Sequence, residues 1–224
     1  MIKRLLILGA VVAISVPASA ITIVQWDFNT SITNPSTGAG ILALQGGVVS
    51  SSASGAGSTD GGSPNNAINT ATYPAQNTGS GTAGVAFFTD TTGFQNIQVS
   101  WDQRLSNTAS INWAVEYTTD GSTWNAFSTY QGNGTTNFFN NNVANLSSIT
   151  GANNNANFGV RFVSIFAPGG AGYVANGSTS TYSTAGTSRW DMVTISADPV
   201  PEPATMAILA AAGLAAAARR RRKS

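Results

Sequence analysis

The C-terminal segment constrains this chain most, because it sets where a folded body must end. An uncharged, alanine-rich run occupies residues 204–218, and five cations follow it. Alanine and leucine favour helix, and a helix satisfies its own backbone polar groups in lipid. At about 1.5 Å per residue the run spans about 22 Å, and the long stems of flanking cations extend that reach. The sequence therefore predicts a transmembrane helix over 204–218.

Two shorter signals flank this apolar run. Cations favour the cytoplasmic side of a membrane, so the basic cluster orients the segment with the body outside. Prolines in the preceding motif hold the chain extended and resist helix formation. The motif is Val200, Pro201, Glu202 and Pro203, and the basic cluster is Arg219, Arg220, Arg221, Arg222 and Lys223. From physics alone, a single-span anchor with a proline-rich turn outside the membrane is the alternative.

The order of motif, apolar run and arginine cluster resembles the PEP-CTERM protein-sorting domain of Gram-negative bacteria. That resemblance covers about the last 25 residues of the chain and implies recognition by exosortase, a membrane transpeptidase-like enzyme. Cleavage near the motif and transfer to the cell surface or extracellular matrix would follow. The resemblance concerns sorting and implies no activity for the rest of the chain.

The N-terminus independently predicts export. Lys3 and Arg4 form a short basic region, residues 5–16 are apolar, and Ala18 and Ala20 are the small residues of a cleavage site. A buried N-terminal helix would leave these features without a role. The predicted organisation is a signal peptide at 1–20, a folded body at 21–198 and the sorting signal at 199–224.

The composition of residues 21–200 excludes several classes of function. Three arginines stand against eight carboxylates, which gives a net charge of −5. Without a basic patch to neutralise phosphates, a nucleic-acid partner is not expected. The chain contains neither cysteine nor histidine. Disulfides, Ser-His-Asp and Cys-His catalysis and the usual zinc sites are therefore excluded.

Alternating apolar residues predict β-strands throughout the body. The clearest segments are 21–28, 97–101, 111–118, 158–166 and 189–195, with turn signals such as Asp120-Gly121 between them. Short strands separated by glycine- and asparagine-rich turns favour an all-β antiparallel sandwich. Trp26, Trp101, Trp113 and Trp190 are expected in its core, and residues 50–66, 133–142 and 151–157 are expected in loops.

Four stretches of the body, at 101–110, 115–121, 154–162 and 190–195, resemble jelly-roll domains of secreted bacterial surface proteins. The resemblance implies the same fold over residues 95–196 and, with Trp26-Asp27-Phe28, over the whole body. Such domains serve as carbohydrate-binding modules, adhesive domains and appendages of hydrolases, so the resemblance does not identify an activity.

No catalytic residue or resident metal is expected. A glycoside hydrolase needs two carboxylates about 5 to 10 Å apart, and Asp102 and Glu116 are the best candidates for such a pair. Calcium needs several oxygen ligands, and Asp27 and Asp191 lie in terminal strands that a jelly roll can bring together. Carboxylates bound by turn N–H groups are the simpler interpretation of both aspartates.

Aromatic residues in loop-like stretches are candidates for sugar stacking. Trp124, Tyr130 and Tyr173 are the predicted glycan contacts, and asparagine is abundant around them.

These observations favour a non-enzymatic exported protein of the cell surface or extracellular matrix. Its predicted partners are an exosortase-type enzyme, the inner membrane during transit and extracellular polysaccharide. The alternatives are a carbohydrate-binding module with a defined sugar site and a hydrolase using Asp102 and Glu116.

Overall fold

A computed structural model describes residues 20–201, 211–214 and 219 of the chain. The predicted signal peptide lies outside the described residues except for Ala20, and so do Glu202 and Pro203 of the sorting motif. Of the predicted transmembrane helix at 204–218, residues 211–214 are described and are helical. Within the described ranges, no helix is long and apolar enough to cross a membrane.

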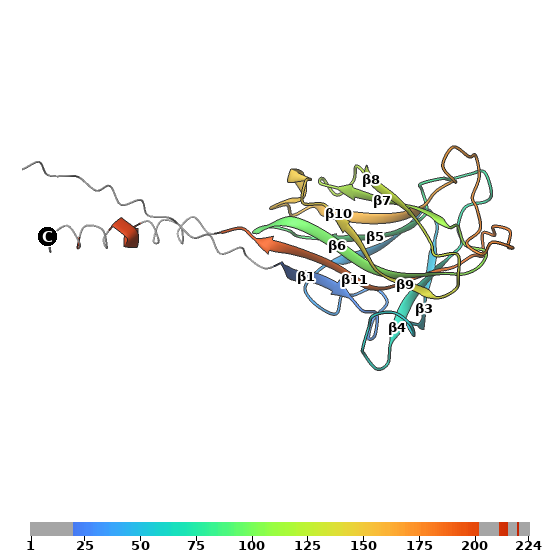
Figure 1. Ribbon diagram of the computed structural model, residues 1–224, viewed down its shortest axis with the longest axis horizontal. Coiled ribbons are helices and arrows are strands. Elements are labelled where there is room, and N and C mark those ends of the chain that lie inside the picture. Colours follow the sequence, from blue (N-terminus) through green and yellow to red (C-terminus); the bar gives the residue numbers. More distant parts are fainter. Residues whose placement is uncertain (1–19, 202–210, 215–218, 220–224) are drawn as a thin grey trace, which may run out of the picture.

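The body consists of two antiparallel sheets (Figure 1). The six-stranded sheet contains β1 (Ile21–Trp26), β3 (Val49–Ser54), β4 (Asn66–Ala71), β6 (Phe94–Leu105), β9 (Phe138–Asn145) and β11 (Ser188–Pro199). The five-stranded sheet contains β2 (Ile41–Gln45), β5 (Gly84–Thr89), β7 (Asn112–Thr118), β8 (Asn125–Gln131) and β10 (Phe158–Ser164). A short 3₁₀ helix, Thr150–Ala152, precedes β10. The predicted antiparallel β-sandwich is confirmed.

Strands β4 to β11 pair in a nested order. β4 pairs with β11, β5 with β10, β6 with β9, and β7 with β8. Successive pairs alternate between the two sheets, so the chain resembles one long hairpin wrapped around a core. β1, β2 and β3 extend the sheets beside this eight-stranded arrangement.

Alternation along the strands places an aromatic core between the sheets. Trp190 packs edge-on against Trp113, with ring centroids 5.3 Å apart, and lies 5.0 Å from the Phe162 ring. Trp101 contacts Phe162 from the facing sheet at 4.5 Å. All four tryptophans predicted to be buried are at most 3 % exposed. Period-2 patterning therefore identified the inward faces correctly.

Two of the predicted loops are partly strand. β3 occupies residues 49–54 of the serine-rich stretch, and β9 begins at Phe138 within the asparagine-rich stretch. Both are outer strands of the six-stranded sheet, and each pairs with a single neighbour. Serine and asparagine weaken an isolated strand signal, but a ladder of main-chain hydrogen bonds to an apolar neighbour overrides that preference.

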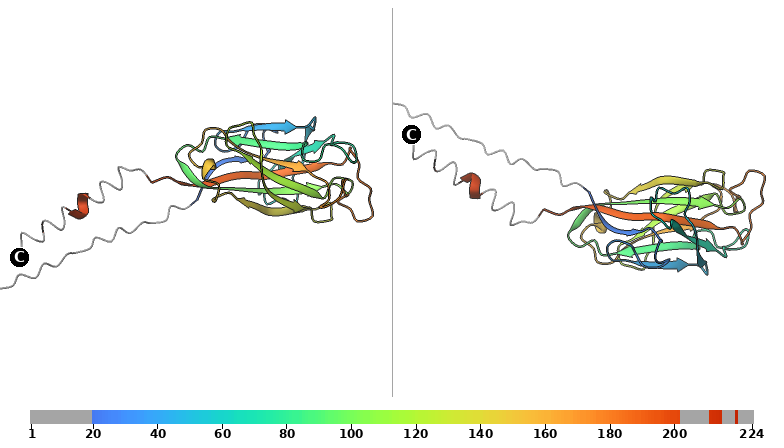
Figure 2. Two further views of the ribbon diagram at one scale, coloured as in Figure 1. Left: turned by 90° about the horizontal axis from the view of Figure 1, so that it is seen from above. Right: turned by 90° about the horizontal axis from the view of Figure 1, so that it is seen from below.

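The first and last strands lie side by side. Ile21 pairs in register with Ala197, so β1 begins where β11 ends. Both ends of the sandwich chain consequently leave from one end of its long axis (Figures 1 and 2). β11 is also central, because β4, β6 and β1 all pair with it.

Candidate functional site

The outer face of the six-stranded sheet carries a group of charged side chains. Trp101, Gln103 and Trp190 point into the core, so alternation directs four charged residues outward. They are Asp102 and Arg104 on β6 and Arg189 and Asp191 on β11. In register, Asp191 is opposite Asp102 and Arg189 is opposite Arg104. The sheet therefore presents a pair of carboxylates beside a pair of guanidinium groups.

The loop at 55–65, between β3 and β4, covers the two carboxylates. Asp102 Oδ2 accepts hydrogen bonds from the backbone N–H and the hydroxyl of Thr59, both at 2.6 Å. Asp102 Oδ1 accepts the N–H of Asn141 in β9 at 2.8 Å. The side chain is 1 % exposed. Asp102 thus fastens both the loop and β9 to the sheet.

Asp191 is fully buried under the same loop. Its Oδ1 accepts the N–H of Met192 at 2.8 Å, whereas Oδ2 has no hydrogen-bond partner among the described residues. Burial raises the pKa of Asp191 to about 7, and the nearby carboxylates of Asp60 and Asp102 add to the rise. Near neutral pH this carboxyl therefore exchanges a proton.

The side-chain oxygen of Asn65 lies near Asp191 under the same loop. This Oδ1 is also buried and unpartnered within the described part of the chain. A Cβ on Gly55 would lie 1.8 Å from Asn65 Oδ1 and 2.6 Å from Asp191 Oδ2, so both oxygens converge on the space beside this glycine. The Oδ2–H of a neutral Asp191 can donate to Asn65 there, and a side chain at residue 55 would block that contact.

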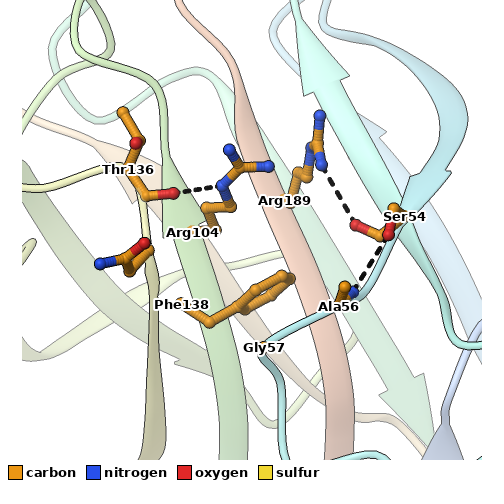
Figure 3. Close-up of a pocket in the computed structure, with 8 residues that line it drawn as sticks. Ser54, Ala56, Gly57, Arg104, Thr136, Phe138 and Arg189 are labelled. Atoms are coloured by element: carbon orange, nitrogen blue, oxygen red, sulfur yellow. Dashed lines mark hydrogen bonds between the residues drawn. The ribbon is translucent and has the colours of Figure 1, made fainter.

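A cavity of about 310 Å³ opens beside this covered region (Figure 3). It is lined by Ser54, Ala56, Gly57, Arg104, Thr136, Asn137, Phe138 and Arg189. Figure 3 shows the two arginines next to each other on neighbouring strands, between the carbonyl groups of Thr136 and Ser54. The body is acidic as a whole, yet two of its three arginines meet in this cavity.

Asp27 and Asp191, the two aspartates considered as calcium ligands, have different surroundings. Asp27 Oδ1 accepts the N–H of Asn29 within its own turn, and the carboxylates that act on Asp191 are Asp60 and Asp102. Among the residues that the structure describes, no three acidic, histidine or cysteine side chains form a group suited to a metal ion. The expectation of no resident metal stays a prediction, and calcium near Asp27 and Asp191 stays the less favoured alternative.

The predicted carboxylate pair is split between the two sheets. Asp102 lies on the outer face of the six-stranded sheet, under the loop at 55–65. Glu116 lies on the outer face of the five-stranded sheet, where it forms an ion pair with Arg161 at 2.5 Å. Packed sheets are about 10 Å apart, so outward side chains on opposite sheets are separated by more than the spacing that glycoside hydrolysis requires. The two candidate carboxylates therefore do not form the pair that a glycoside hydrolase needs.

The predicted glycan contacts lie in three separate places. Trp124 is half-buried on the five-stranded sheet, beside Phe88 and under the guanidinium of Arg161, which is 4.7 Å from its ring centre. Tyr130 reaches between the sheets and donates its hydroxyl to Gln103 Oε1 at 2.8 Å.

Tyr173 is 3 % exposed and stacks on Tyr182. The structure therefore brings none of these three rings into a common groove.

Sequence reasoning missed the arginine pair. Arg104 and Arg189 are far apart in the chain, and the net charge of the body does not show that they are neighbours. Phe138, which lines the same cavity, lies in the stretch 133–142 that was expected to be a loop. The available signal was the alternation of the strands. Arg189 begins the predicted strand at 189–195, and Arg104 continues the outward-facing positions of the predicted strand at 97–101.

Residues 199–223 match the family model described as the PEP-CTERM protein-sorting motif, which confirms the resemblance inferred from the sequence. No curated protein matches the chain. The match begins at Pro199, the last residue of β11. It identifies an exported protein that exosortase processes at the membrane.

Proposed function

We propose that this PEP-CTERM protein is a non-enzymatic component of the cell surface or extracellular matrix, whose β-sandwich associates with extracellular polysaccharide. The proposal needs no cofactor or catalytic residue. It includes transit across the inner membrane, in which the C-terminal segment holds the chain until the body is released to the outside.

The junction between the sandwich and the sorting motif is the observation that carries the proposal. Val200 donates its N–H to the carbonyl of Gly93 at 2.8 Å, and the side chain of Val200 is already 41 % exposed. Among the residues that the structure describes, the buried hydrophobic residues of the core lie between 24 and 197. Cleavage at or after the motif would leave the core complete, as sorting of a folded domain requires.

The fold and surface support a role in a polysaccharide matrix. The nested strand pairs are those expected of a jelly roll, a fold that many surface and sugar-binding domains share. Only 8 % of the residues in the chain are charged. The surface consequently offers hydroxyl and amide groups, which hydrogen-bond to hydrated polymers without strong ionic contacts.

A carbohydrate-binding module with a defined site is the second candidate. The cavity beside Phe138 favours it, because about 310 Å³ lies at the lower end of the range for small-ligand sites. A glycan array probed with residues 21–200 separates the two candidates. Saturable binding to one sugar class supports the module, and binding to none refutes it.

Sorting is tested by mass spectrometry of the mature C-terminus in cells with and without exosortase. We expect the tail to be missing from the surface protein only when the enzyme is present, and the double variant Pro201→Ala/Pro203→Ala to remain uncut in the membrane fraction. An Asn96→Ala variant, changed outside the motif, should be processed normally. Recovery of Ser224 from the surface fraction of wild-type cells would refute processing.

A further inference from the structure

Arg104 and Arg189 form a like-charge pair without a carboxylate partner. They are directly opposite in the β6–β11 register, where like charges destabilise a sheet. Throughout residues 20–201 the ion pair that forms is Arg161–Glu116, on the other sheet. The pKa of Arg189 is lowered by burial and then by the charge of Arg104. The fold therefore holds two cations together at a cost to its stability.

Most of the guanidinium donors in this pair are free for a ligand. Arg104 donates from Nε to the carbonyl of Thr136. Arg189 donates from Nη1 to the carbonyl of Ser54 at 3.1 Å and from Nε to Asn69 Oδ1 at 3.4 Å. An arginine has five N–H donors, and these contacts are all to neutral oxygens. The contacts fix both side chains in position while leaving N–H groups available to the cavity.

The neighbouring carboxylates do not neutralise the pair. Asp102 lies two residues before Arg104 and Asp191 lies two residues after Arg189, and the loop at 55–65 covers both carboxylates. Their oxygens accept hydrogen bonds from Thr59, Asn141 and Met192 and not from an arginine. The positive charge therefore faces the cavity.

The remaining walls of the cavity suit a sugar ring. Phe138 is half-buried and offers an apolar surface, and Asn137 is exposed and supplies an amide. A Cβ at residue 57 would lie 3.8 Å from Phe138 Cδ2, in van der Waals contact with the ring, so glycine at this position leaves that part of the ring uncovered. Cations, an aromatic face and an amide in one open cavity match an acidic saccharide.

We propose that Arg104 and Arg189 bind the carboxylate of a uronic acid unit in an extracellular polysaccharide, with the sugar ring against Phe138. Planar guanidinium groups match the two oxygens of a carboxylate. The inference rests on the proposed association with polysaccharide and gives it a ligand class. The net charge of −5 on the body repels a polyanion at long range, so binding depends on this local pair.

The site is tested by calorimetric titration of residues 21–200, which contain the whole core, with a short galacturonate oligomer. Its methyl ester tests the need for the carboxylate, and inorganic phosphate and sulfate test whether any anion suffices. We expect binding of the acid form alone among the saccharides. Arg104→Gln or Arg189→Gln should weaken it by about tenfold or more, since a hydrogen bond to a charged group contributes that much.

Three further variants make the test specific. Arg161→Gln removes one positive charge on the opposite sheet and should leave galacturonate binding unchanged. Phe138→Ala should weaken binding of the oligomer and leave binding of phosphate unchanged. Arg104→Lys keeps the charge without the planar fork and should bind more weakly than wild type.

The stability of the arginine variants provides an independent readout. Because each removes a like-charge repulsion, Arg104→Gln and Arg189→Gln should unfold at a temperature no lower than that of wild type. Loss of binding in a folded variant therefore reports on the site.

Several results would overturn the proposal: no galacturonate binding, equal binding of the methyl ester, binding of phosphate and sulfate alone, or galacturonate binding that the Gln variants leave intact. None of these would alter the fractionation and C-terminal mass spectrometry that test matrix sorting. A failed carboxylate site and a failed matrix assignment are thus distinguishable.

Discussion

Replacing Asp191 by asparagine should remove most of the pH dependence of stability between about pH 4 and pH 7. The folded state holds the pKa of this carboxyl at about 7, raised from 3.8. A raised pKa means that the folded state binds the proton more tightly than the unfolded state does. The stability from this group is therefore fully present below about pH 4 and is lost as the pH rises through 7.

The size of the effect follows from the shift. Each pKa unit corresponds to about 1.4 kcal/mol, so the free energy of unfolding should fall by up to about 4 kcal/mol across this window. Opening of the loop at 55–65 would hydrate the carboxylate and limit the loss. Above about pH 5.5 the window is clear of side chains with ordinary pKa values, because the chain has no histidine and carboxyl groups ordinarily titrate near pH 4.

Asparagine is a nearly isosteric replacement that satisfies both neighbours without titrating. Its Oδ1 can accept the N–H of Met192, and its Nδ2 can donate to Asn65 Oδ1. We expect the variant to match wild type below about pH 4 and to be the more stable protein near pH 7.5, where the loss in wild type is nearly complete.

Urea denaturation of residues 21–200 at several pH values measures the difference directly. Asp198→Asn, which changes another carboxylate on β11, should keep the slope of the wild-type protein. A wild-type free energy of unfolding that is flat from about pH 5 to pH 7.5 would show that Asp191 is hydrated in the folded protein and would refute the reasoning.

Two core positions give further predictions for residues 21–200. Trp190→Ala should lower the free energy of unfolding by about 3 to 5 kcal/mol, because it empties the space against Trp113 and Phe162, whereas Trp190→Phe should lose less; a loss below about 1 kcal/mol in urea denaturation would contradict the packing. Gly84→Ala should destabilise the protein by about 1 to 3 kcal/mol in the same assay, since its Cβ would lie 1.8 Å from the carbonyl oxygen of Phe162, and Gly61→Ala, with open space around it, should be close to neutral.

The sequence predicted the central strands of the sandwich and missed the outer strands β3 and β9. Strands such as β7 and β10 alternate apolar and polar residues because one face contacts the facing sheet. β3 and β9 hold few large apolar residues, and pairing with β4 and β6 makes them strands. Local sequence carries no signal for that pairing.

The candidate site was harder to predict because it depends on register. Arg104 and Arg189 become neighbours only through the pairing of β6 with β11, and Asp191 acquires its raised pKa only when the loop at 55–65 covers it. Asp102 and Glu116 were considered as a pair, yet they belong to strands of different sheets. The alternation along a strand indicates whether a side chain points inward or outward. The register and the sheet to which each strand belongs decide which side chains become neighbours.

The position of β11 has a consequence for the order of folding during export. This strand is the last of the body to emerge from a translocation channel that passes the chain from its N-terminus, yet it is the strand against which β1, β4 and β6 assemble. The six-stranded sheet cannot close until the segment just before the sorting motif has crossed. The fold is therefore completed when the motif becomes accessible to exosortase. A chain truncated before Ser188 would reach the outside without β11, the strand with which β1, β4 and β6 pair.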